Sequence, residues 1–540
     1  MASDLGTVQA PAVSRVLLPL DPTGSLRILS PDVKRADTEP RPTLDDVIHD
    51  RPARTLAQRL TPARITGVTS RRSARLNLEF SAWRPHLAPF FIPLVIILTL
   101  TVITYRTNRT PLGWILTVVW SLPIVGTLIG LQGAVLLRHS PRDRRQLTTP
   151  PPLVTAETLF VIVPTIGRHD TFPALARSVS SFVEYLPVAF QHLWVHILVE
   201  DGCEAMQQIR ALADQHPQVR LVVVPRGYST PNGTRFKARA NHYAHQLRYS
   251  EGDARDDVWV LHMDDDTGIG PDTASALAHF VQRQATAGPD AKHLAQGILS
   301  YPRENAVNRF TWLADAVRPA DDFARFRAAT GSGTPVAGVH GELLMIRGSA
   351  EATIGWDFGP NSIVEDAHFA LTFCSRYPGR SDWFNGRSYG ASPATVHDLI
   401  RQRERWAWGL IALAMNRSIP LRYRFFLALS LMTWAIGPLQ HLLVVLLIGW
   451  VVGMTNTSPV TESVLLLWSV NLAYVIWTYW EGLRLNVLSS QKRRRYWWEP
   501  IAVVSLIPIF ALLEGLGGLR GLLKFLQRAD KEFVVIAKPA

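Results

Sequence analysis

The sequence has little cysteine and lacks the common short motifs of nucleotide and zinc sites. Only Cys203 and Cys374 occur, without a CxxC or a His/Cys cluster, so neither a disulfide framework nor a structural zinc site is supported. The active part is therefore expected to face a reducing compartment. No GxGxxG or GxxxxGK(S/T) follows the first predicted strand at 159–165, which argues against a dinucleotide-binding Rossmann domain and against a P-loop.

The first 87 residues lack the continuous apolar core of a secretory signal. They are rich in Arg, Pro, Ser and Thr, and they are predicted to form a largely disordered arm that either contacts anionic lipid or stays solvated. The whole chain of 540 residues, for which several structural units are expected, has a net charge of +12 yet is 47% hydrophobic. This combination favours a basic membrane protein over a nucleic-acid binder, so no nucleic-acid partner is expected.

Two apolar runs of membrane-core length follow the arm. The runs at 89–105 and 111–137 are separated by a few residues only, so they predict a transmembrane hairpin over 88–137. The arginines of 138–145 then hold the following residues on the cytoplasmic side.

Further apolar runs lie near the C-terminus, at 425–452, 464–479 and 501–513. They predict transmembrane helices over 425–525, followed by a tail at 526–540. The last run meets Glu514 and several glycines, and a full crossing would put a basic tail outside, against the charge rule. A kinked or re-entrant segment is therefore expected at this run.

Between these regions, residues 138–396 alternate short apolar strands with amphipathic helices. This alternation predicts a nucleotide-binding α/β domain. The predicted strands lie at 159–165, 193–198, 219–224 and 258–263.

The strand at 258–263 runs directly into Asp264, Asp265 and Asp266 and then a glycine turn. These acids should lie at the carboxyl edge of the sheet, where α/β folds bind ligands. Adjacent carboxylates repel one another unless a cation lies among them, and oxygen ligands at i and i+2 of an extended segment suit Mg²⁺ or Mn²⁺. A helix N-cap or a solvated turn is the structural alternative.

Two other clusters fit a nucleotide. Asp201 ends a strand before a glycine, where it either accepts hydrogen bonds from a base or ribose or forms an Asp-Gly turn. Arg235, Lys237 and Arg239 alternate, so an extended backbone would project them from one side toward phosphate oxygens. The alternative for these three is a solvated basic face.

Two more clusters fit a sugar and a diphosphate. Glu365 and Asp366 precede a predicted helix, where an enclosed carboxylate acts as a general base on a sugar hydroxyl or simply stabilises the helix N-terminus. In an amphipathic helical region at 397–424, Gln402, Arg405 and Trp406 fall at i, i+3 and i+4 on one face. That face matches a diphosphate and a pyranose, although an Arg and Trp pair also anchors helices at lipid headgroups.

In this order and spacing the clusters resemble the membrane-integrated family 2 glycosyltransferases of the GT-A fold, which include cellulose, hyaluronan and chitin synthases. The resemblance covers roughly residues 155–410. It is carried by the Val-Pro-Thr ending at Thr165, by Asp201, Lys237, Asp264, Asp266, Glu365 and Asp366, and by the QxxRW at 402–406. Shorter segments at 237–240, 262–264, 356–360 and 365–366 resemble the egghead-type β-1,4-mannosyltransferase branch.

The resemblance implies an α/β GT-A domain in the cytoplasm, joined to transmembrane helices, and a metal-dependent inverting hexosyltransferase. The implied donor is a GDP- or UDP-sugar such as GDP-mannose, the acceptor is a membrane-associated lipid or glycan, and the product is a β-glycoside. Mg²⁺ or Mn²⁺ would be bound by Asp264 and Asp266, and Asp366 would be the catalytic base. Donor binding is assigned to Thr165, Glu200, Asp201, Lys237, Asp264, Asp265, Gln402 and Arg405, and acceptor binding to Glu365 and Trp406.

The same motifs also serve processive synthases that polymerise and export a β-glucan or mannan-type chain. The small number of apolar runs favours a single-addition enzyme over such a polymerase. A glycoside hydrolase would have no use for a diphosphate-binding set, and a transporter would carry its ionisable residues within the membrane segments. The expected location is a bacterial-type plasma membrane.

Overall fold

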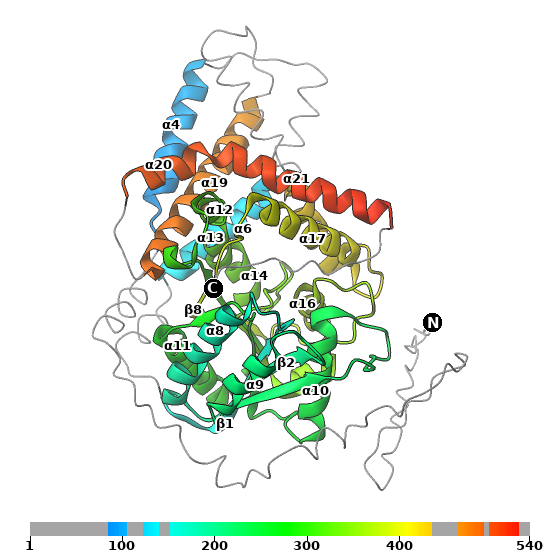
Figure 1. Cartoon of the computed structure of the whole chain (residues 1–540). Helices are drawn as coiled ribbons and strands as arrows, with labels where there is room; N and C mark the ends of the chain where they lie inside the picture. Colours follow the sequence, from blue (N-terminus) through cyan, green and yellow to red (C-terminus); the bar gives the residue numbers. More distant parts are fainter. Residues whose placement is uncertain (1–84, 105–121, 140–151, 435–461, 491–495, 529–540) are drawn as a thin grey trace, which may run out of the picture. The chain divides into compact units, whose positions relative to one another are not determined.

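The structure is a computed structural model, and it describes residues 85–104, 122–139, 152–434, 462–490 and 496–528 (Figure 1). These ranges all belong to one compact unit, Leu60–Ala540. The predicted arm at 1–84, the last residues of the predicted tail, and parts of the predicted membrane runs at 111–137 and 425–452 lie outside the described residues.

An eight-stranded mixed sheet forms the centre of the α/β domain, with strands in the order β3-β2-β1-β4-β7-β6-β8-β5. The strands are β1 Val154–Pro164, β2 Phe190–Glu200, β3 Val219–Val224, β4 Val258–His262, β5 Gly268–Ile269, β6 Leu294–Ser300, β7 Leu344–Arg347 and β8 Ser381–Tyr389. β3, β2, β1 and β4 are mutually parallel, so the carboxyl ends of these four strands share one edge of the sheet.

The predicted α/β class and the four predicted strands are confirmed, because each strand is a run of apolar residues that the sheet buries. In β1, Leu159, Val161 and Val163 belong to the core on one face of the sheet, while the guanidinium of Arg248 lies over the Phe160 ring on the other. Local sequence patterns do not predict β6, β7 and β8. β8 explains why, since its sequence SDWFNGRSY is largely polar although most of it is buried.

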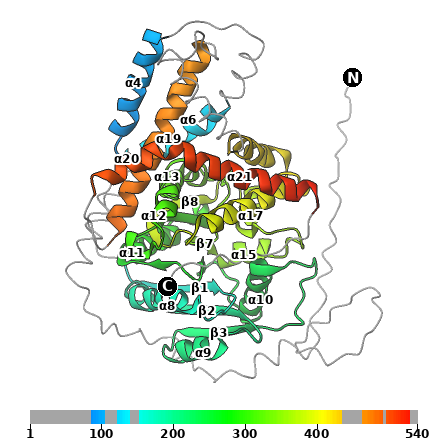
Figure 2. The ribbon, with the colours of Figure 1, turned by 45° about the horizontal axis from the view of Figure 1, so that its top comes forward.

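Helices cover both faces of the sheet (Figure 2). The larger core lies between the sheet and α8 Phe172–Tyr185, α9 Met206–Asp214 and α11 Pro271–Thr286. On the other face lie α10 Phe236–Ser250, α15 Gly348–Ile354 and α16 Glu365–Arg376. The short helices are η1 Leu186–Val188, η2 Gly288–Asp290, η3 Arg303–Asn305, α12 Arg309–Ala314, α13 Val317–Asp321, the π-helix η4 Asp322–Phe326, and α14 Arg327–Gly331.

The apolar runs near both ends of the chain form helices that pack on the α/β domain. These are α4 Ala88–Thr104, α6 Pro123–His139, a helical segment described over 421–434, α19 Glu462–Ser489, α20 Trp498–Ser505 and α21 Ile507–Leu526. Among the described residues, none of these helices taken singly has the length and apolarity of a membrane span. The pair α20 and α21 passes that test together, with a bend of 49° between the two helices. The predicted kink is therefore present.

α21 lies along α17 Val396–Ala414, and both views show the two helices side by side (Figures 1 and 2). Glycines make this close packing possible. A Cβ placed on Gly517 would lie 2.4 Å from the Cβ of Arg403, and one placed on Gly521 would lie 2.7 Å from the carbonyl oxygen of Glu404. The C-terminal helix pair thereby holds the helix that contains the QxxRW sequence.

Candidate active site

A cavity of about 1030 Å³ lies at the carboxyl edge of the parallel strands. It extends from the turn after β4 to α6, α19 and α21, so it joins the α/β domain to the apolar helices. The predicted site residues that line it are Thr165, Glu200, Lys237, Asp264, Asp265, Asp266, Glu365, Asp366, Gln402, Arg405 and Trp406. Asp201 is not among the lining residues.

The three aspartates after β4 lie in a turn, where Thr267 N donates to the Asp264 carbonyl at 3.3 Å. The extended geometry expected for Asp264 and Asp266 is therefore wrong, because the chain must turn back toward β5. The Thr165 hydroxyl donates to Asp265 Oδ2 at 2.6 Å, which fixes the middle carboxylate against the end of β1. Asp266 is nearly buried and accepts a hydrogen bond from the Thr267 hydroxyl at 3.2 Å.

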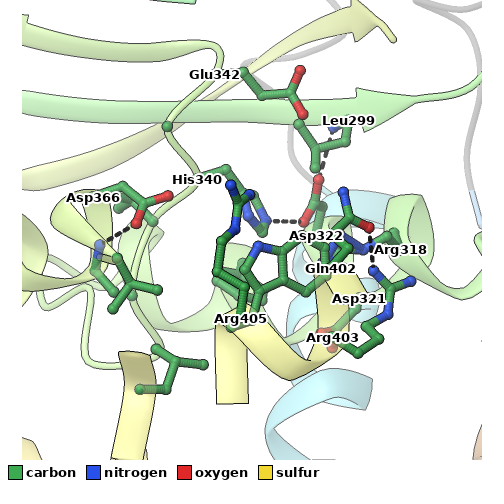
Figure 3. A pocket seen from close by; sticks show the side chains of 18 of the residues that line it. Leu299, Arg318, Asp321, Asp322, His340, Glu342, Asp366, Gln402, Arg403 and Arg405 are labelled. Atoms are coloured by element: carbon green, nitrogen blue, oxygen red, sulfur yellow. Dashed lines mark hydrogen bonds and ion pairs between the residues drawn. The ribbon is translucent and has the colours of Figure 1, made fainter. Parts of the chain in front are cut away.

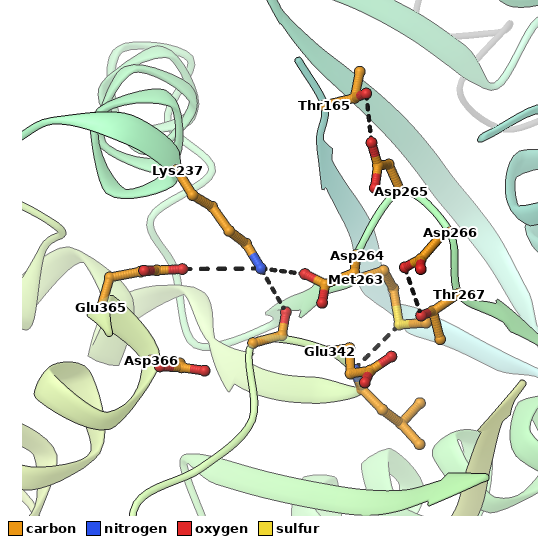
Figure 4. Close-up of polar contacts among 12 residues, drawn as sticks. Thr165, Lys237, Met263, Asp264, Asp265, Asp266, Thr267, Glu342, Glu365 and Asp366 are labelled. Carbon is orange, nitrogen blue, oxygen red and sulfur yellow. Dashed lines mark hydrogen bonds and ion pairs between the residues drawn. The ribbon is translucent and has the colours of Figure 1, made fainter. Parts of the chain in front are cut away.

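Lys237 connects this turn to the start of α16 (Figure 4). Its ammonium is bonded to Asp264 Oδ1, donates to the Gly341 carbonyl at 3.2 Å and lies 3.9 Å from Glu365 Oε1. Burial alone would lower the pKa of Lys237, but Asp264 and Glu365 raise it above the ordinary lysine value. The side chain is therefore a fixed positive charge among carboxylates.

The extended arrangement expected for Arg235, Lys237 and Arg239 is also wrong. Arg235 is the N-cap of α10, and Lys237 and Arg239 lie in its first turn, so they point to different partners. Arg239 pairs with Glu200 and donates to the carbonyl of Pro225 at 2.8 Å. Two residues of α10 thus hold two acids of the site: Arg239 holds Glu200, and Lys237 holds Asp264.

Glu365 and Asp366 occupy the first turn of α16, so the helix N-terminus and the cavity share the same two acids. Burial and the nearby charge of Asp366 raise the pKa of Glu365, and Lys237 opposes this shift. Asp366 is only partly buried, and its Oδ1 accepts a hydrogen bond from the backbone N–H of Ala367 at 2.7 Å. Its carboxylate is thereby held at the rim of the cavity.

Gln402, Arg405 and Trp406 all lie on the predicted helix, α17. Burial lowers the pKa of Arg405, whereas the charges of Glu365, Asp264 and Asp366, which line the same cavity, oppose this shift. The guanidinium of Arg318 lies 3.8 Å from the centroid of the Trp406 ring, and that of Arg403 lies 4.5 Å from it. Arginine therefore covers part of the indole surface that was expected to meet a sugar.

The structure adds residues to the cavity that the sequence analysis did not single out. They are Arg318 and Asp321 of α13, Asp322 of η4, His340 and Glu342 (Figure 3). His340 and Glu342 lie on a loop before β7. None of these residues belongs to a spaced motif, and only the adjacent acids at 321 and 322 offered any local signal.

Asp201 lies at the end of β2 but outside the cavity lining. Its backbone N–H donates to the carbonyl of Val224 at 3.0 Å, and its own carbonyl accepts from Arg226 Nε at 3.1 Å. A contact between Asp201 and a base stays a prediction.

The residues at the acidic turn fit a divalent cation in their chemistry. Asp264 and Asp266 offer hard carboxylate oxygens, which Mg²⁺ and Mn²⁺ prefer, and such sites commonly complete their coordination with water and substrate phosphates. Across the described ranges, no group of three or more His, Cys, Asp or Glu side chains forms a complete protein-only metal site. The turn therefore offers two carboxylates of the kind that such a cation prefers.

Part of the chain matches a known protein family. Residues 259–481, from β4 into α19, match the model of the glycosyl transferase family group 2. Residues 259–481 are therefore similar to a glycosyl transferase family 2 domain. This range includes the acidic turn, the start of α16 and the QxxRW helix.

Relatives with curated descriptions are mannosyltransferases. The β-1,4-mannosyltransferase egh of Drosophila melanogaster is 31% identical over 287 residues, covering 52% of this chain and 58% of that protein. The β-1,4-mannosyltransferase bre-3 of Caenorhabditis elegans is 32% identical over 234 residues, covering 43% of this chain and 49% of that protein. The chain thus spans about half the length of the curated relatives it matches.

Solved structures that resemble the chain are more distant in sequence. The mannosyltransferase PcManGT of Pyrobaculum calidifontis, solved with GDP-Man and Mn²⁺, has a TM-score of 0.39 and 15% identity, covering 77% of this chain and all of that one. Residues 1–349 of TarS from S. aureus have a TM-score of 0.30 and 12% identity, covering 70% and 94% respectively.

Proposed function

We propose that this protein is an inverting hexosyltransferase of the GT-A type, which transfers a sugar from a nucleotide diphosphate donor to a membrane-associated acceptor. GDP-mannose is the first donor to test, because the curated relatives are mannosyltransferases. The observation that carries the proposal is that Asp264, Asp366 and Arg405, from three separate parts of the chain, line one cavity at the sheet edge.

The donor would lie with its diphosphate between the acidic turn and α17. A divalent cation held by Asp264 and Asp266 would supply positive charge to the diphosphate oxygens. The charge of Asp264 acts on Arg405, which lines the same cavity, and a guanidinium binds phosphate oxygens bidentately. Lys237 would hold the carboxylate of Asp264 in place beside this diphosphate.

Asp366 is the proposed general base. It would accept the proton of an acceptor hydroxyl while that oxygen bonds to the anomeric carbon and the bond to the diphosphate breaks on the opposite face. The bond from Ala367 N to Asp366 Oδ1 leaves Oδ2 of this partly exposed carboxylate as the oxygen to accept the proton. No covalent enzyme intermediate is needed for such a displacement.

The acceptor would enter from the side of the apolar helices. The cavity lining continues from Asp366 to Thr127 of α6 and Asn471 of α19, whose side chains hydrogen-bond to each other at 2.8 Å. This continuity supports an acceptor anchored in a membrane, with the catalytic domain on the cytoplasmic face. It would also suit a processive synthase that passes a growing glycan between the helices, which is the alternative function.

The test is nucleotide release by the full chain in membranes, with GDP-mannose, UDP-glucose or UDP-N-acetylglucosamine as donor, before and after removal of divalent cations. We expect one donor to be used, the activity to depend on Mg²⁺ or Mn²⁺, and Asp366→Asn to lower turnover by ~10²- to 10⁴-fold with nucleotide binding retained. The control is Asp290→Asn, which changes an exposed aspartate of η2.

Near-normal transfer by Asp366→Asn would refute the assignment of Asp366 as the base. Nucleotide release that survives removal of divalent cations would refute the requirement for a metal. The length of the labelled product on a gel separates single addition from polymerisation. A β configuration of the product, determined by NMR, is the expected sign of inversion from an α-linked donor.

A further inference from the structure

A histidine and an aspartate that the proposed chemistry does not use lie deeper in the same cavity. His340 Nε2 and Asp322 Oδ1 are 2.6 Å apart, and Asp322 Oδ2 accepts a hydrogen bond from Leu299 N at 2.7 Å (Figure 3). Asp322 is 1% exposed, so both of its oxygens are committed to a fixed geometry. The aspartate therefore holds the imidazole rather than binding anything in the cavity itself.

The ring of His340 is fixed on other sides as well. Its centroid lies 4.5 Å from that of the Phe326 ring, and its backbone N–H donates to Gln296 Oε1 at 3.0 Å. With Nε2 engaged by Asp322, the second ring nitrogen, Nδ1, has no hydrogen-bond partner among the described residues. His340 lines the cavity, so a ligand there can come within reach of its ring.

The charged groups that act on His340 include the proposed base, Asp366. The largest influences on the pKa of His340 are burial, which lowers it, and Asp322, which raises it more, followed by Arg318 and Asp366. The charge of Asp366 acts on His340, Lys237 and Arg405. A Cβ placed on Gly341, the residue after His340, would lie 3.3 Å from Asp366 Oδ2, so the loop that carries His340 passes close to the proposed base.

The element that carries Asp322 and Phe326 packs against one of the apolar helices. Asp322 and Phe326 are the ends of the π-helix η4, which packs against α6 so closely that a Cβ on Gly133 would lie 1.8 Å from the carbonyl oxygen of Ala324. π-helical turns are rare in proteins, and those that occur are often found at functional sites. The pair therefore lies on or beside an element that packs against α6, and it lines the same cavity as Asp366.

We propose that His340, held by Asp322, is an acceptor-positioning residue whose Nδ1 hydrogen-bonds a hydroxyl of the terminal acceptor sugar, next to the hydroxyl that Asp366 deprotonates. This inference rests on the proposed glycosyl transfer. The ligand it assigns is a glycoside with at least two neighbouring hydroxyl groups, one reacting and one bound. The imidazole takes no part in the proton transfer.

The test uses His340→Gln, in which the amide nitrogen replaces Nε2 and keeps the contact with Asp322, while nothing replaces Nδ1. The acceptor probes are octyl β-D-glucopyranoside and octyl β-D-mannopyranoside, added to the full chain with the donor that the wild-type protein uses. We expect kcat/KM for the glycoside to fall about 10- to 100-fold, mainly through KM, as for the loss of a hydrogen bond that involves a charged group. Donor KM and acceptor-independent nucleotide release should stay unchanged.

Asp322→Asn and His340→Asn complete the design. Asp322→Asn weakens the hold on the ring and should also raise the glycoside KM, and His340→Asn keeps a polar group near Nδ1 and should recover part of the loss. His397→Gln is the matched control, because His397 is an exposed residue of α17 outside the cavity lining. Thermal unfolding of each variant monitors folding.

The outcomes separate this inference from the proposed function. An unchanged glycoside KM in His340→Gln overturns the inference alone, and so does an equal loss of donor hydrolysis, which would indicate a structural role. Wild-type protein that releases nucleotide but transfers to neither glycoside also overturns it. Wild-type protein that releases nucleotide from none of the donors overturns the proposed glycosyl transfer itself.

Discussion

Arg403 is the side chain by which the C-terminal helix pair is expected to control the active site. It is 2% exposed, and it bonds to Asp315, to Glu514 Oε1 at 2.5 Å and to Gln402 Oε1 at 2.7 Å. Glu514 Oε2 in turn accepts from the indole N–H of Trp434 at 3.0 Å. One guanidinium therefore joins α17, α21 and the segment before α13.

We predict that Arg403→Met destabilises the protein by about 3–5 kcal/mol, because removal of one partner leaves buried carboxylates without their counter-charge. Asp315 is also 2% exposed, so water cannot replace the lost bond at that oxygen, while the side chain of Glu514 is 19% exposed and is partly solvated. Glu514→Gln should therefore cost less, about 1–3 kcal/mol. The double variant should show a coupling of about 0.5–3 kcal/mol.

The assay is a double-mutant cycle of thermal unfolding in detergent, combined with kcat/KM for nucleotide release. Arg401→Met is the matched control, because Arg401 lies on the same helix and has none of these partners. We expect activity to fall with stability, since Gln402 and Arg405 flank Arg403 on α17. Strictly additive effects of Arg403→Met and Glu514→Gln, or a loss no larger than that of Arg401→Met, would refute the reasoning.

Three further predictions concern other contacts. Lys237→Met should weaken nucleotide binding about 10- to 100-fold in a titration, because Asp264 loses a charged hydrogen bond. Glu351→Gln should cost about 3–5 kcal/mol in urea unfolding, since Arg248, which is 2% exposed, loses its carboxylate. Burial by itself raises the pKa of Glu351, but Arg248 lowers this pKa by more, so the net pKa is below the ordinary value. The stability that the pair contributes should therefore be fully present at neutral pH and should decline below about pH 4.3, the ordinary pKa of glutamate. Gly521→Val should lower the unfolding temperature, because its side chain would enter the space of the Glu404 carbonyl, with a cost of about 1–3 kcal/mol.

Each of these changes has a control of the same kind. Lys292→Met alters a lysine outside the cavity, Glu204→Gln an exposed glutamate, and Gly518→Val a helix position with nothing within 4 Å of its Cβ. Wild-type nucleotide affinity in Lys237→Met, an acid-unfolding profile of Glu351→Gln that matches the wild type, or equal effects of Gly518→Val and Gly521→Val would contradict the corresponding prediction.

The strands and the QxxRW helix follow from local patterns in the sequence. The strand at 258–262 is a run of apolar residues that the sheet buries completely, and Gln402, Arg405 and Trp406 share a helical spacing within a single helix. Short-range periodicity is sufficient in both cases, because a buried strand and an amphipathic helix are defined by residues a few positions apart. The acids were recognised in the same way, since they follow the ends of predicted elements.

Local patterns predict the wrong backbone conformation at two places. The basic residues at 235–239 start a helix instead of an extended segment, and the acids at 264–266 form a turn. In both places the chain follows contacts with distant residues. Lys237 bonds an acid 27 positions away, and Asp265 is held by Thr165, 100 positions away.

The amino-acid sequence by itself determined the four strands β1 to β4, the QxxRW helix and the polar residues at their ends. Only the tertiary structure decided that His340 meets Asp322 and that Arg403 meets Glu514, 111 positions along the chain. Neither pair has a spacing that a sequence can display, because each arises where separate elements pack together. The chemistry at the strand ends was therefore predictable, whereas the contacts that position an acceptor and fix the QxxRW helix were not.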